Sequence, residues 1–548
     1  MTGSAARPGT GRRAGASPVA GAGVLTRLAL RRDRIMLPAW VYVLTALIAG
    51  NVYSFKTLFA TAAERDKLVA SAGSNPAFQF LYGRLYSTSI GGLTAWRYGV
   101  YVALGAGLMS TFLVIRHTRA EEEAGRTELA GSTAVGRHAP LAAGLLVAVA
   151  GNVAIAALFG IVLPLLGLPV AGSVALALAT AASGLVFAGI AAVAAQLSST
   201  ARGARGMTFT VLGVAYLLQA VGNSAGADGP QWLTWLSPLG WAGLVRPFAG
   251  ERWWVLVLPA AVVAVTAAAA FLLAGRRDLG AGLIPDRPGP AIAGPGLRGP
   301  FGLAWRLQRG TLAGWAAGLL AGGIASGAAG KGVGSLLSSS GQLRTAFLRL
   351  GGQAAIINAY LAAIMALAGL VAAAYATSAV LRLHAEEAAG RADPVLVSVA
   401  SRVGWWASHI AVAVLGTAAV LAAAGLGTGL GYGLRAGDAG TQVPHLLGAA
   451  LAQLPAALAV AAVAVLAFGV LPDWSVGIGW TAMAAAVLLA LFGEILQLDQ
   501  WVLDISPFTH VPKLPGGTVS AAPLVWLAVI TLVLAAAGLA GLRRRDIA

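Results

Sequence analysis

Long uninterrupted apolar stretches constrain this chain more than any other feature of its sequence. About twelve of them recur along its 548 residues, each near the roughly 20 residues that a helix needs to cross about 30 Å of bilayer hydrocarbon. Hydrophobic residues make up 58% of the chain and charged residues only 10%, whereas soluble domains carry about 25% charged residues. We therefore expect an all-α polytopic membrane protein rather than a soluble enzyme.

Twelve membrane spans are expected from the positions of these stretches. They lie at 35–54, 98–116, 140–166, 170–195, 206–224, 253–275, 311–330, 356–381, 404–431, 446–471, 475–496 and 521–542. With the N-terminus placed in the cytoplasm, 25 of the 37 Lys and Arg residues fall on cytoplasmic segments. The positive-inside rule favours that arrangement, so both termini are predicted to be cytoplasmic.

An internal duplication divides these spans into two sets. Residues 120–126 (AEEEAGR) match residues 385–391 (AEEAAGR) at six of seven positions. Three further matches are Trp40 with Trp315, Ser237-Pro238 with Ser506-Pro507, and Arg276-Arg277-Asp278 with Arg544-Arg545-Asp546. Since an even number of spans separates the copies, the repeats are parallel. The expected architecture is a fused pseudo-dimer of two six-helix halves.

Composition places the boundaries of these halves. Residues 1–20 lack periodicity and are expected to be disordered, and the first half follows at 21–278. A linker at 279–301 contains five prolines, which are incompatible with a continuous helix, and the second half occupies 302–548. Arg27, Arg31 and Arg34 recur at helical spacing beside leucines, which predicts an amphipathic helix on the cytoplasmic membrane surface.

The net charge of +17 does not indicate a nucleic-acid-binding protein. The basic residues lie at the ends of apolar runs and form no single patch or stripe. The chain has no cysteine, which excludes disulfides, thiolate metal sites and thiol nucleophiles. No cluster of histidines and no metal-binding motif is found, so we expect no metal.

The duplicated acidic segment is the strongest functional signal. In each copy a glutamate precedes an arginine by four residues, Glu122 with Arg126 and Glu387 with Arg391, which on a helix pairs the two side chains. A surface pair of this kind contributes little to stability. The positive-inside rule ignores acidic residues, so a topology signal does not explain why the glutamates recur. We interpret the segment as a docking surface, against the alternative of a solvated charged loop.

Two segments carry a resemblance to a known family. RHTRAEEEAGRTELAGSTAVGRHAPLAA (116–143) is the more specific, and RLHAEEAAGRADPVLVSVASR (382–402) is its weaker partner. With the duplication and the outer Ser-Pro pairs, they resemble ABC-type exporter permeases of the polyketide-antibiotic and multidrug efflux kind. The second copy departs from the first, because Ala388 stands at the position of Glu123 and Pro394 at that of Leu129.

The resemblance implies a permease subunit that moves lipophilic compounds outward across a bacterial cytoplasmic membrane. Two copies of a separate cytoplasmic ATPase would bind ATP and Mg²⁺, and this chain would bind no cofactor of its own. The residues expected to couple to that ATPase are Glu121, Glu122, Glu123, Arg126, Glu386, Glu387 and Arg391.

No nucleotide-binding motif is expected in this chain. Gly330-Lys331-Gly332 lacks the earlier glycine and the following Ser or Thr of a phosphate loop, and residues 338–342 (SSSGQ) only faintly resemble an ATPase signature. We therefore expect a permease and not an enzyme.

A few polar residues within the expected spans are candidates for a substrate path. Glu494 stands near the end of a span, where an ionisable residue is costly and suggests function, although a shallow position would allow a structural role. Asn358, Gln219 and His409 are better explained as packing residues that bond between helices. Gly314, Gly318 and Gly322 share one helix face, which predicts close helix packing.

Three alternatives to an ATP-driven drug exporter remain open. A proton-driven secondary transporter also has two six-span halves, but few intramembrane carboxylates are present to carry protons. An exporter of lipids or cell-envelope precursors differs only in its cargo. A membrane enzyme of lipid or glycan assembly requires paired carboxylates or a metal cluster, and the sequence shows neither.

Overall fold

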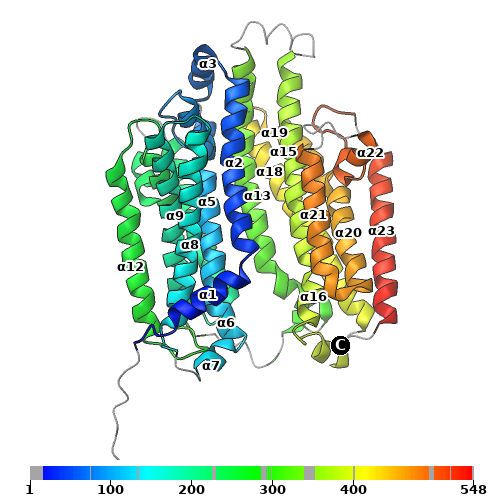
Figure 1. Ribbon diagram of the computed structural model, residues 1–548. Helices are drawn as coiled ribbons and strands as arrows, with labels where there is room; N and C mark the ends of the chain where they lie inside the picture. The colour runs from blue at the N-terminus through cyan, green and yellow to red at the C-terminus, as the bar shows by residue number, and fades with distance from the viewer. Residues whose placement is uncertain are drawn as a thin grey trace, which may run out of the picture. The chain divides into compact units, whose positions relative to one another are not determined.

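The computed structural model describes residues 17–73, 76–131, 135–224, 230–285, 292, 294–297, 299–338, 352–398, 401–492, 499–518 and 520–545. Throughout these ranges the regular structure is helical, with no strand. Twelve helices are long and apolar enough to cross a membrane, which confirms the all-α polytopic fold. The chain divides into two units, residues 1–288 and residues 289–548 (Figure 1).

The first unit contains six of the candidate spans. They are α2 (Met36–Leu58), α5 (Ile90–His117), α8 (Ala139–Leu165), α9 (Val170–Leu197), α10 (Ala201–Ser224) and α12 (Val257–Ala274). The shorter helices of this unit are α1 (Ala22–Arg32), α3 (Ala62–Ala72), α4 (Pro76–Tyr82), α6 (Arg119–Glu123), α7 (Arg126–Gly131), η1 (Gln231–Leu236), α11 (Pro238–Leu244) and η2 (Trp253–Leu256).

The second unit contains the other six candidate spans. They are α13 (Pro300–Ser338), α15 (Gly352–Val380), α18 (Arg402–Ala436), a span made of α19 (Ala439–Leu451) and α20 (Leu454–Val470), α21 (Ser475–Phe492) and α23 (Ala521–Arg544). Its shorter helices are η3 (Pro295–Leu297), α16 (Arg382–Glu387), α17 (Asp393–Ser398), η4 (Pro472–Trp474), α22 (Gln500–Leu503) and η5 (Pro507–His510).

Every expected span corresponds to a helix, but several boundaries differ, most of all in the seventh, which begins at Pro300, eleven residues before its expected start. The second begins at Ile90, eight residues before the expected start, because the polar residues of its first two turns conceal the pattern. The tenth is interrupted between Leu451 and Leu454. Pro455 stands in the first turn of α20, where proline is tolerated because no intrahelical donor is needed there.

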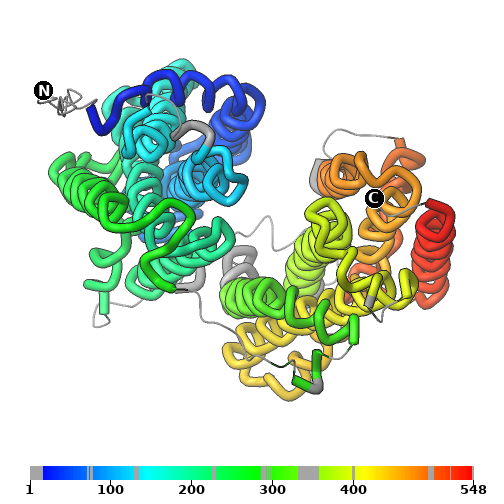
Figure 2. Tube along the Cα trace, turned by 90° about the horizontal axis from the view of Figure 1, so that it is seen from below, coloured from blue at the N-terminus to red at the C-terminus, as the bar shows by residue number. Residues whose placement is uncertain are grey.

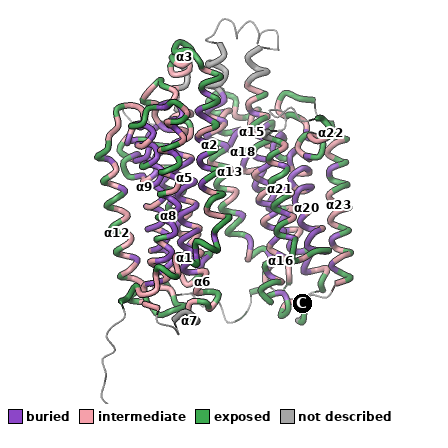
Figure 3. Tube along the Cα trace, viewed as in Figure 1, coloured by how far each residue is buried: buried purple, intermediate pink, exposed green. Residues whose placement is uncertain are grey.

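The core of the first unit is built around α5 and α9. In both helices, 72% of the apolar membrane-spanning stretch is buried inside the protein. In α12 only 17% of that stretch is buried. Large apolar residues of α12 such as Val265 and Leu272 are 68% and 65% exposed, as expected for side chains that face lipid. Figure 3 shows the buried residues gathered on the inner helices, and Figure 2 views the same helices end-on.

Glycines set the closest helix contacts of the second unit. A Cβ atom on Gly427 or Gly431 of α18 would lie 2.3 Å or 2.1 Å from a carbonyl oxygen of α13, so the two backbones touch. On the facing surface of α13 the close contacts occur at Gly323 and Gly327. The close packing predicted for Gly314, Gly318 and Gly322 stays a prediction, since an added Cβ atom there would meet no described atom within 4 Å.

Each unit has two distinct ends. In the first unit α1, α6 and α7 gather at one end and α3 lies at the other (Figure 1). We call the ends that carry α6 and α16 the acidic ends, since they hold the duplicated glutamates. The final spans, α12 and α23, both finish at the acidic end of their own unit, with Arg277 and Arg545 just beyond them.

Candidate functional site

The acidic segment folds in the same way in both units. After α5 the chain forms the single turn of α6, then reverses at Gly125, whose φ is +69°, and enters α7. After α15 it forms α16, reverses at Gly390, whose φ is +64°, and enters α17. Glycine adopts this left-handed conformation readily, and it commonly ends helices for that reason.

The reversal changes which residues pair. Arg126 donates from Nε and Nη2 to the two carboxylate oxygens of Glu121, at 2.6 and 3.0 Å. Arg391 pairs in the same way with Glu386, at 2.8 and 3.3 Å. The predicted pairs of Glu122 with Arg126 and of Glu387 with Arg391 are therefore wrong, because the helix ends before the arginine and the helical register is lost.

The second glutamate of each copy pairs with the end of the last span. Arg277, beyond α12, donates to Glu122 at 2.7 Å, and Arg545, beyond α23, donates to both oxygens of Glu387 at 2.5 and 2.7 Å. These two arginines occupy matching places in the duplicated Arg-Arg-Asp sequence. Equivalent residues therefore make equivalent ion pairs in the two units.

A third arginine completes each network. Arg137 donates to the backbone oxygen of Arg277 at 2.7 Å, and Arg402, its counterpart, donates to the backbone oxygen of Arg545 at 3.0 Å. We call each set an arginine clamp. The clamp of the first unit consists of Glu122, Arg277 and Arg137, and that of the second consists of Glu387, Arg545 and Arg402.

The glutamates of the acidic segments are largely buried, whereas the turns that follow them are exposed. The side chains of Glu122 and Glu387 are only 10% and 9% exposed, and those of Glu121 and Glu386 only 15% and 6% exposed. The turns beyond them are open to solvent, with exposed residues listed as Glu123, Ala124, Arg126, Glu128, Ala388, Ala389, Gly390 and Arg391. The glutamates therefore anchor the turn, and the turn presents the free surface.

In the first unit, Glu123 and Arg119 also hold the turn in place. Glu123 accepts a bond from the backbone N–H of Ala201 at 3.0 Å, which caps the start of α10. Arg119, 1% exposed, donates to Glu122 and to the backbone oxygen of Gly280. In the second copy Ala388 stands at the position of Glu123. Alanine has no side-chain acceptor, so this position of the second unit cannot provide an equivalent cap.

The predicted interfacial helix is α1, and it contacts the acidic segment. Arg32 donates to Glu121 at 2.7 Å. The exposed side chains of Arg27 and Arg31 lie on α1, whereas Arg34, also exposed, lies two residues beyond its end and not on the helix as predicted. Apolar neighbours are exposed as well, such as Val24 at 72%. A helix with this mixed exposed surface suits the membrane–water boundary.

The polar candidates for a substrate path are not brought together. His409 is 2% exposed and bonds to Gln308 at 3.3 Å near the acidic end of the second unit, whereas Asn358 lies near the other end against Gly516. Gln219, 2% exposed, belongs to the first unit and bonds to Asn223. Glu494 lies outside the described residues.

The weak nucleotide motifs gain no support from the fold. Residues 330–332 lie inside α13, not in a loop that precedes a helix, as a phosphate-binding loop requires. Residues 339–342 lie outside the described part of the chain. In the described part, no group of three or more His, Asp or Glu side chains is placed to hold a metal ion.

The arginine partners of the clamps were missed as site residues. In the sequence, Arg277 and Arg545 stand out only as matching positions of the duplication. They lie 155 and 158 residues from their glutamates, so sequence spacing does not indicate the contact. One feature of the sequence does indicate these ion pairs, because both the glutamates and these arginines are present in each copy. Two residues kept together in both copies are candidates for contact.

Comparison with known proteins gives two matches. The family model described as "Multidrug efflux system permease Rv1217c, C-terminal domain" matches residues 25–273 and, a second time, residues 297–543. The multidrug efflux system permease protein Rv1217c of Mycobacterium tuberculosis is 43% identical over 525 residues, which cover 95% of this chain and 94% of that protein. The double match of one model agrees with the internal duplication.

Proposed function

Because this chain belongs to the family of multidrug efflux system permeases, we propose that it is the transmembrane subunit of an ATP-driven exporter of lipophilic compounds. ATP and Mg²⁺ bind to a separate cytoplasmic ATPase, two copies of which act on one permease chain. In this proposal the acidic ends face the cytoplasm, and both termini of the chain lie on that side of the membrane.

The observation that carries the proposal is the recurrence of the arginine clamp. Two equivalent turns, each exposed and each anchored from within by a glutamate, suit two identical ATPase subunits that bind one chain. A proton-driven transporter has no need for a duplicated docking surface. The clamp also explains why acidic residues recur where topology requires only basic ones.

The clamps suit a mechanical role as well as a docking role. Separating a largely covered ion pair leaves each charge uncompensated, so such a pair resists separation. When an ATPase displaces the turn at Gly125 or Gly390, the clamp carries that displacement to the end of α12 or α23. Arg32 carries it also to α1 in the first unit.

The test is to alter the exposed turns while leaving the clamps intact. Ala124→Arg and Ala389→Arg place a bulky charge at equivalent exposed positions without touching the glutamates. In a strain that also expresses the candidate ATPase, we expect the double variant to lower recovery of the complex and drug-stimulated ATP hydrolysis by about tenfold or more, since charge placed in an interface costs several kcal/mol. Ala63→Arg, on α3 at the opposite end, is the matched control.

Two results would contradict the proposal. Unchanged complex recovery and hydrolysis in the double variant would remove the turns as a docking surface. Loss of transport when the proton gradient is collapsed at constant ATP would favour the proton-driven alternative. A mass measurement of the complex gives the stoichiometry, expected as one 54.9 kDa permease chain with two ATPase subunits.

A further inference from the structure

Exposed arginines stand near the start of the first span in each unit. We call them the basic segments, and they consist of Arg27, Arg31 and Arg34 in the first unit and of Arg306 and Arg309 in the second. Arg31 and Arg34 lie 275 residues before Arg306 and Arg309, the offset that also aligns the tryptophans of the two first spans. The positive-inside rule requires only that cations stand on the cytoplasmic side of a span, so it does not explain why they recur at one spacing.

The helices turn these arginines away from the body of each unit. Ala29 of α1 and Ala304 of α13 occupy matching positions and are buried, so this face of each helix packs inward. Residues two apart on an α-helix point about 200° apart. Arg31 and Arg306, two residues beyond these alanines, therefore face outward, as their exposure also indicates.

Each basic segment is anchored from within by a buried polar residue. Asp33 and Gln308 occupy matching positions, and both are buried. Asp33 bonds to His117, at the end of α5, at 2.5 Å, and Gln308 bonds to His409 of α18 at 3.3 Å. Both histidines lie near the acidic end of their own unit, so the basic segments lie there too.

The arginines of the basic segments have no described carboxylate to balance them. The ion pairs of the described residues include none of the five. The neighbouring carboxylates have other partners, which are His117 and Arg116 for Asp33, Arg32 and Arg126 for Glu121, and Arg382 and Arg391 for Glu386. Like charges one turn apart on a helix repel each other, so an anion bound between them would stabilise each segment.

Apolar side chains are exposed beside these arginines. In the first unit Leu28 and Ile35 are more than half exposed, and in the second Phe301 and Trp305 are nearly half exposed. A surface that combines arginine with exposed apolar and aromatic side chains at the start of a span suits the boundary between headgroups and acyl chains. A water-soluble anion would leave these apolar side chains uncovered, whereas a phospholipid would cover them.

From these features we infer that each basic segment binds the headgroup of one acidic phospholipid, in the leaflet beside the acidic end of its unit. Arg306 and Arg309 are three residues apart on α13, close enough to hold one phosphate between them, and arginine is suited to bind phosphate through two parallel hydrogen bonds. Arg27 and Arg31 are four residues apart on α1 and have the same relation. The inference does not rest on the proposed function, because each site is formed by one unit of this chain and requires no ATPase.

The test measures lipid binding to the purified full chain in a nonionic detergent, without any ATPase. The probes are dioleoyl phosphatidylglycerol and dioleoyl phosphatidylcholine, which share their acyl chains and differ in the net charge of the headgroup. Native mass spectrometry counts the lipids bound at each concentration. We expect two phosphatidylglycerol molecules per chain, bound at least about tenfold more tightly than phosphatidylcholine, since each basic side chain adds to the attraction of an anionic headgroup.

Variants assign each bound lipid to one basic segment. Arg306→Gln with Arg309→Gln should remove one of the two lipids by weakening its binding about tenfold or more. Exchange of the three arginines of the first segment for glutamine should remove the other lipid. All five side chains are exposed, so these variants should fold normally.

Two further double variants test whether position and charge decide the binding. Arg543→Gln with Arg544→Gln is the matched control, because it removes two exposed arginines from the same end of the second unit. Side chains adjacent in a helix do not face each other, so this pair cannot share one phosphate, and both lipids should stay bound within about twofold of the wild-type affinity. Arg306→Lys with Arg309→Lys should retain its lipid, since lysine also binds phosphate.

Four outcomes would overturn the inference. Equal binding of the two lipids would show that the headgroup charge is not recognised, and an equal loss in the Arg543 and Arg544 control would show a diffuse attraction without a site. Displacement of phosphatidylglycerol by millimolar inorganic phosphate would assign the segments to a free anion. Unchanged lipid binding in the variants, with loss of the complex with the candidate ATPase, would assign them to that protein. The docking test on the turns alters other residues, so the two proposals fail separately.

Discussion

Glu122 and Glu387 each face an arginine at the end of the last helix of their own unit, and each carboxylate is about nine-tenths covered. At this depth solvent screens an ion pair less than at the surface, so both partners matter. The exposed partners, Arg126 and Arg391, are different. Their carboxylate partners raise the pKa of both guanidinium groups, so these residues stay charged at every physiological pH.

Replacing a clamp arginine should destabilise the second unit. Arg545→Gln leaves the buried Glu387 carboxylate without its two charge-assisted bonds, and we expect a loss of about 1–3 kcal/mol in the free energy of unfolding. Arg543→Gln is the control, because Arg543 is exposed on the same helix end. Thermal unfolding in detergent measures both.

A double variant distinguishes pairing from general damage. Glu387→Gln with Arg545→Gln should cost less than the two single changes added together, since the second change removes a charge already left alone. Equal melting temperatures for Arg545→Gln and Arg543→Gln would show that the clamp contributes nothing to stability.

The sequence singled out the acidic residues that recur in both units, but helical spacing paired them wrongly. Helical spacing suggested Glu122 with Arg126, but the positive φ of Gly125 ends the helix and brings Glu121 to that arginine instead. Glycine in a polar segment permits this conformation without requiring it. Glu122 pairs with the nearby Arg119 and with Arg277, and Arg277 comes from a remote part of the chain, where spacing carries no information.

At the scale of helices, hydropathy predicted each span because lipid requires about 20 apolar residues in a row. It did not predict the break in the tenth span, since the residues on both sides of Gln453 are apolar and the pattern runs through it. Hydropathy also did not predict which glycines of α13 contact a neighbouring helix. All glycine ridges look alike in sequence, and only the neighbouring backbone distinguishes Gly323 from Gly314.

The contact between α20 and α23 provides a test of backbone packing. A Cβ atom on Gly538 would lie 2.7 Å from the carbonyl oxygen of Val465, so Gly538→Ala must push the two helices apart. Forcing extra atoms into a packed interior costs about 1–3 kcal/mol, and we expect a matching drop in stability in detergent.

Gly314→Ala is the control for that change, because nothing described lies within 4 Å of its added Cβ atom. Both substitutions place alanine in a helix, so intrinsic helix propensity cancels between them. The packing account fails if the two variants unfold at the same temperature.

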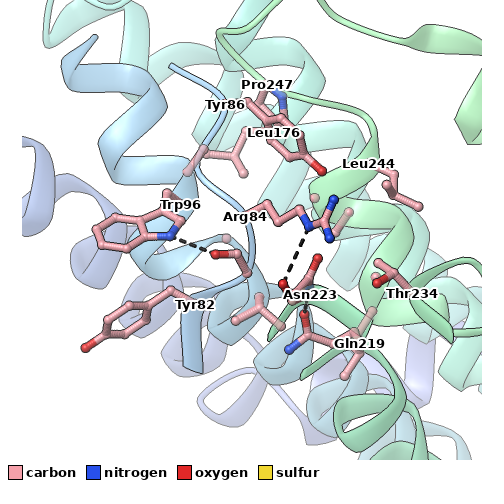
Figure 4. A pocket seen from close by; sticks show the side chains of 18 of the residues that line it. Tyr82, Arg84, Tyr86, Trp96, Leu176, Gln219, Asn223, Thr234, Leu244 and Pro247 are labelled. Carbon is pink, nitrogen blue, oxygen red and sulfur yellow. Dashed lines mark hydrogen bonds between the residues drawn. The ribbon is translucent and has the colours of Figure 1, made fainter. Parts of the chain in front are cut away.

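At the scale of the whole molecule, the duplication was the most predictable feature. The repeated sequence predicted two six-helix units, and one family model matches each of them. The clamps recur as well, although no spacing rule predicted them. A small pocket in the first unit was not predictable from the sequence, because its walls come from five separate segments between Tyr82 and Pro247 (Figure 4).

The absence of cysteine makes the orientation of the chain directly measurable. Single cysteines introduced at exposed Ala124, Ala389 and Ala63 are unique targets for a membrane-impermeant maleimide. In intact cells we expect labelling at Ala63→Cys alone, and in inverted vesicles at Ala124→Cys and Ala389→Cys. The reverse pattern would place the acidic ends outside the cell and would exclude an ATPase partner there.

The helices held by the clamps, α12 and α23, are the least buried of the candidate membrane spans. Only 17% of the apolar stretch of α12 and 11% of that of α23 is covered by the rest of the protein. Most of their neighbours in a membrane are acyl chains, so under the proposed function a displacement carried through Arg277 or Arg545 would move lipid as well as protein. Hydrocarbon thickness and lateral pressure then act as a load on the transport cycle. The properties of the bilayer would then affect the transport rate, which should fall in membranes that resist the tilt of these two helices.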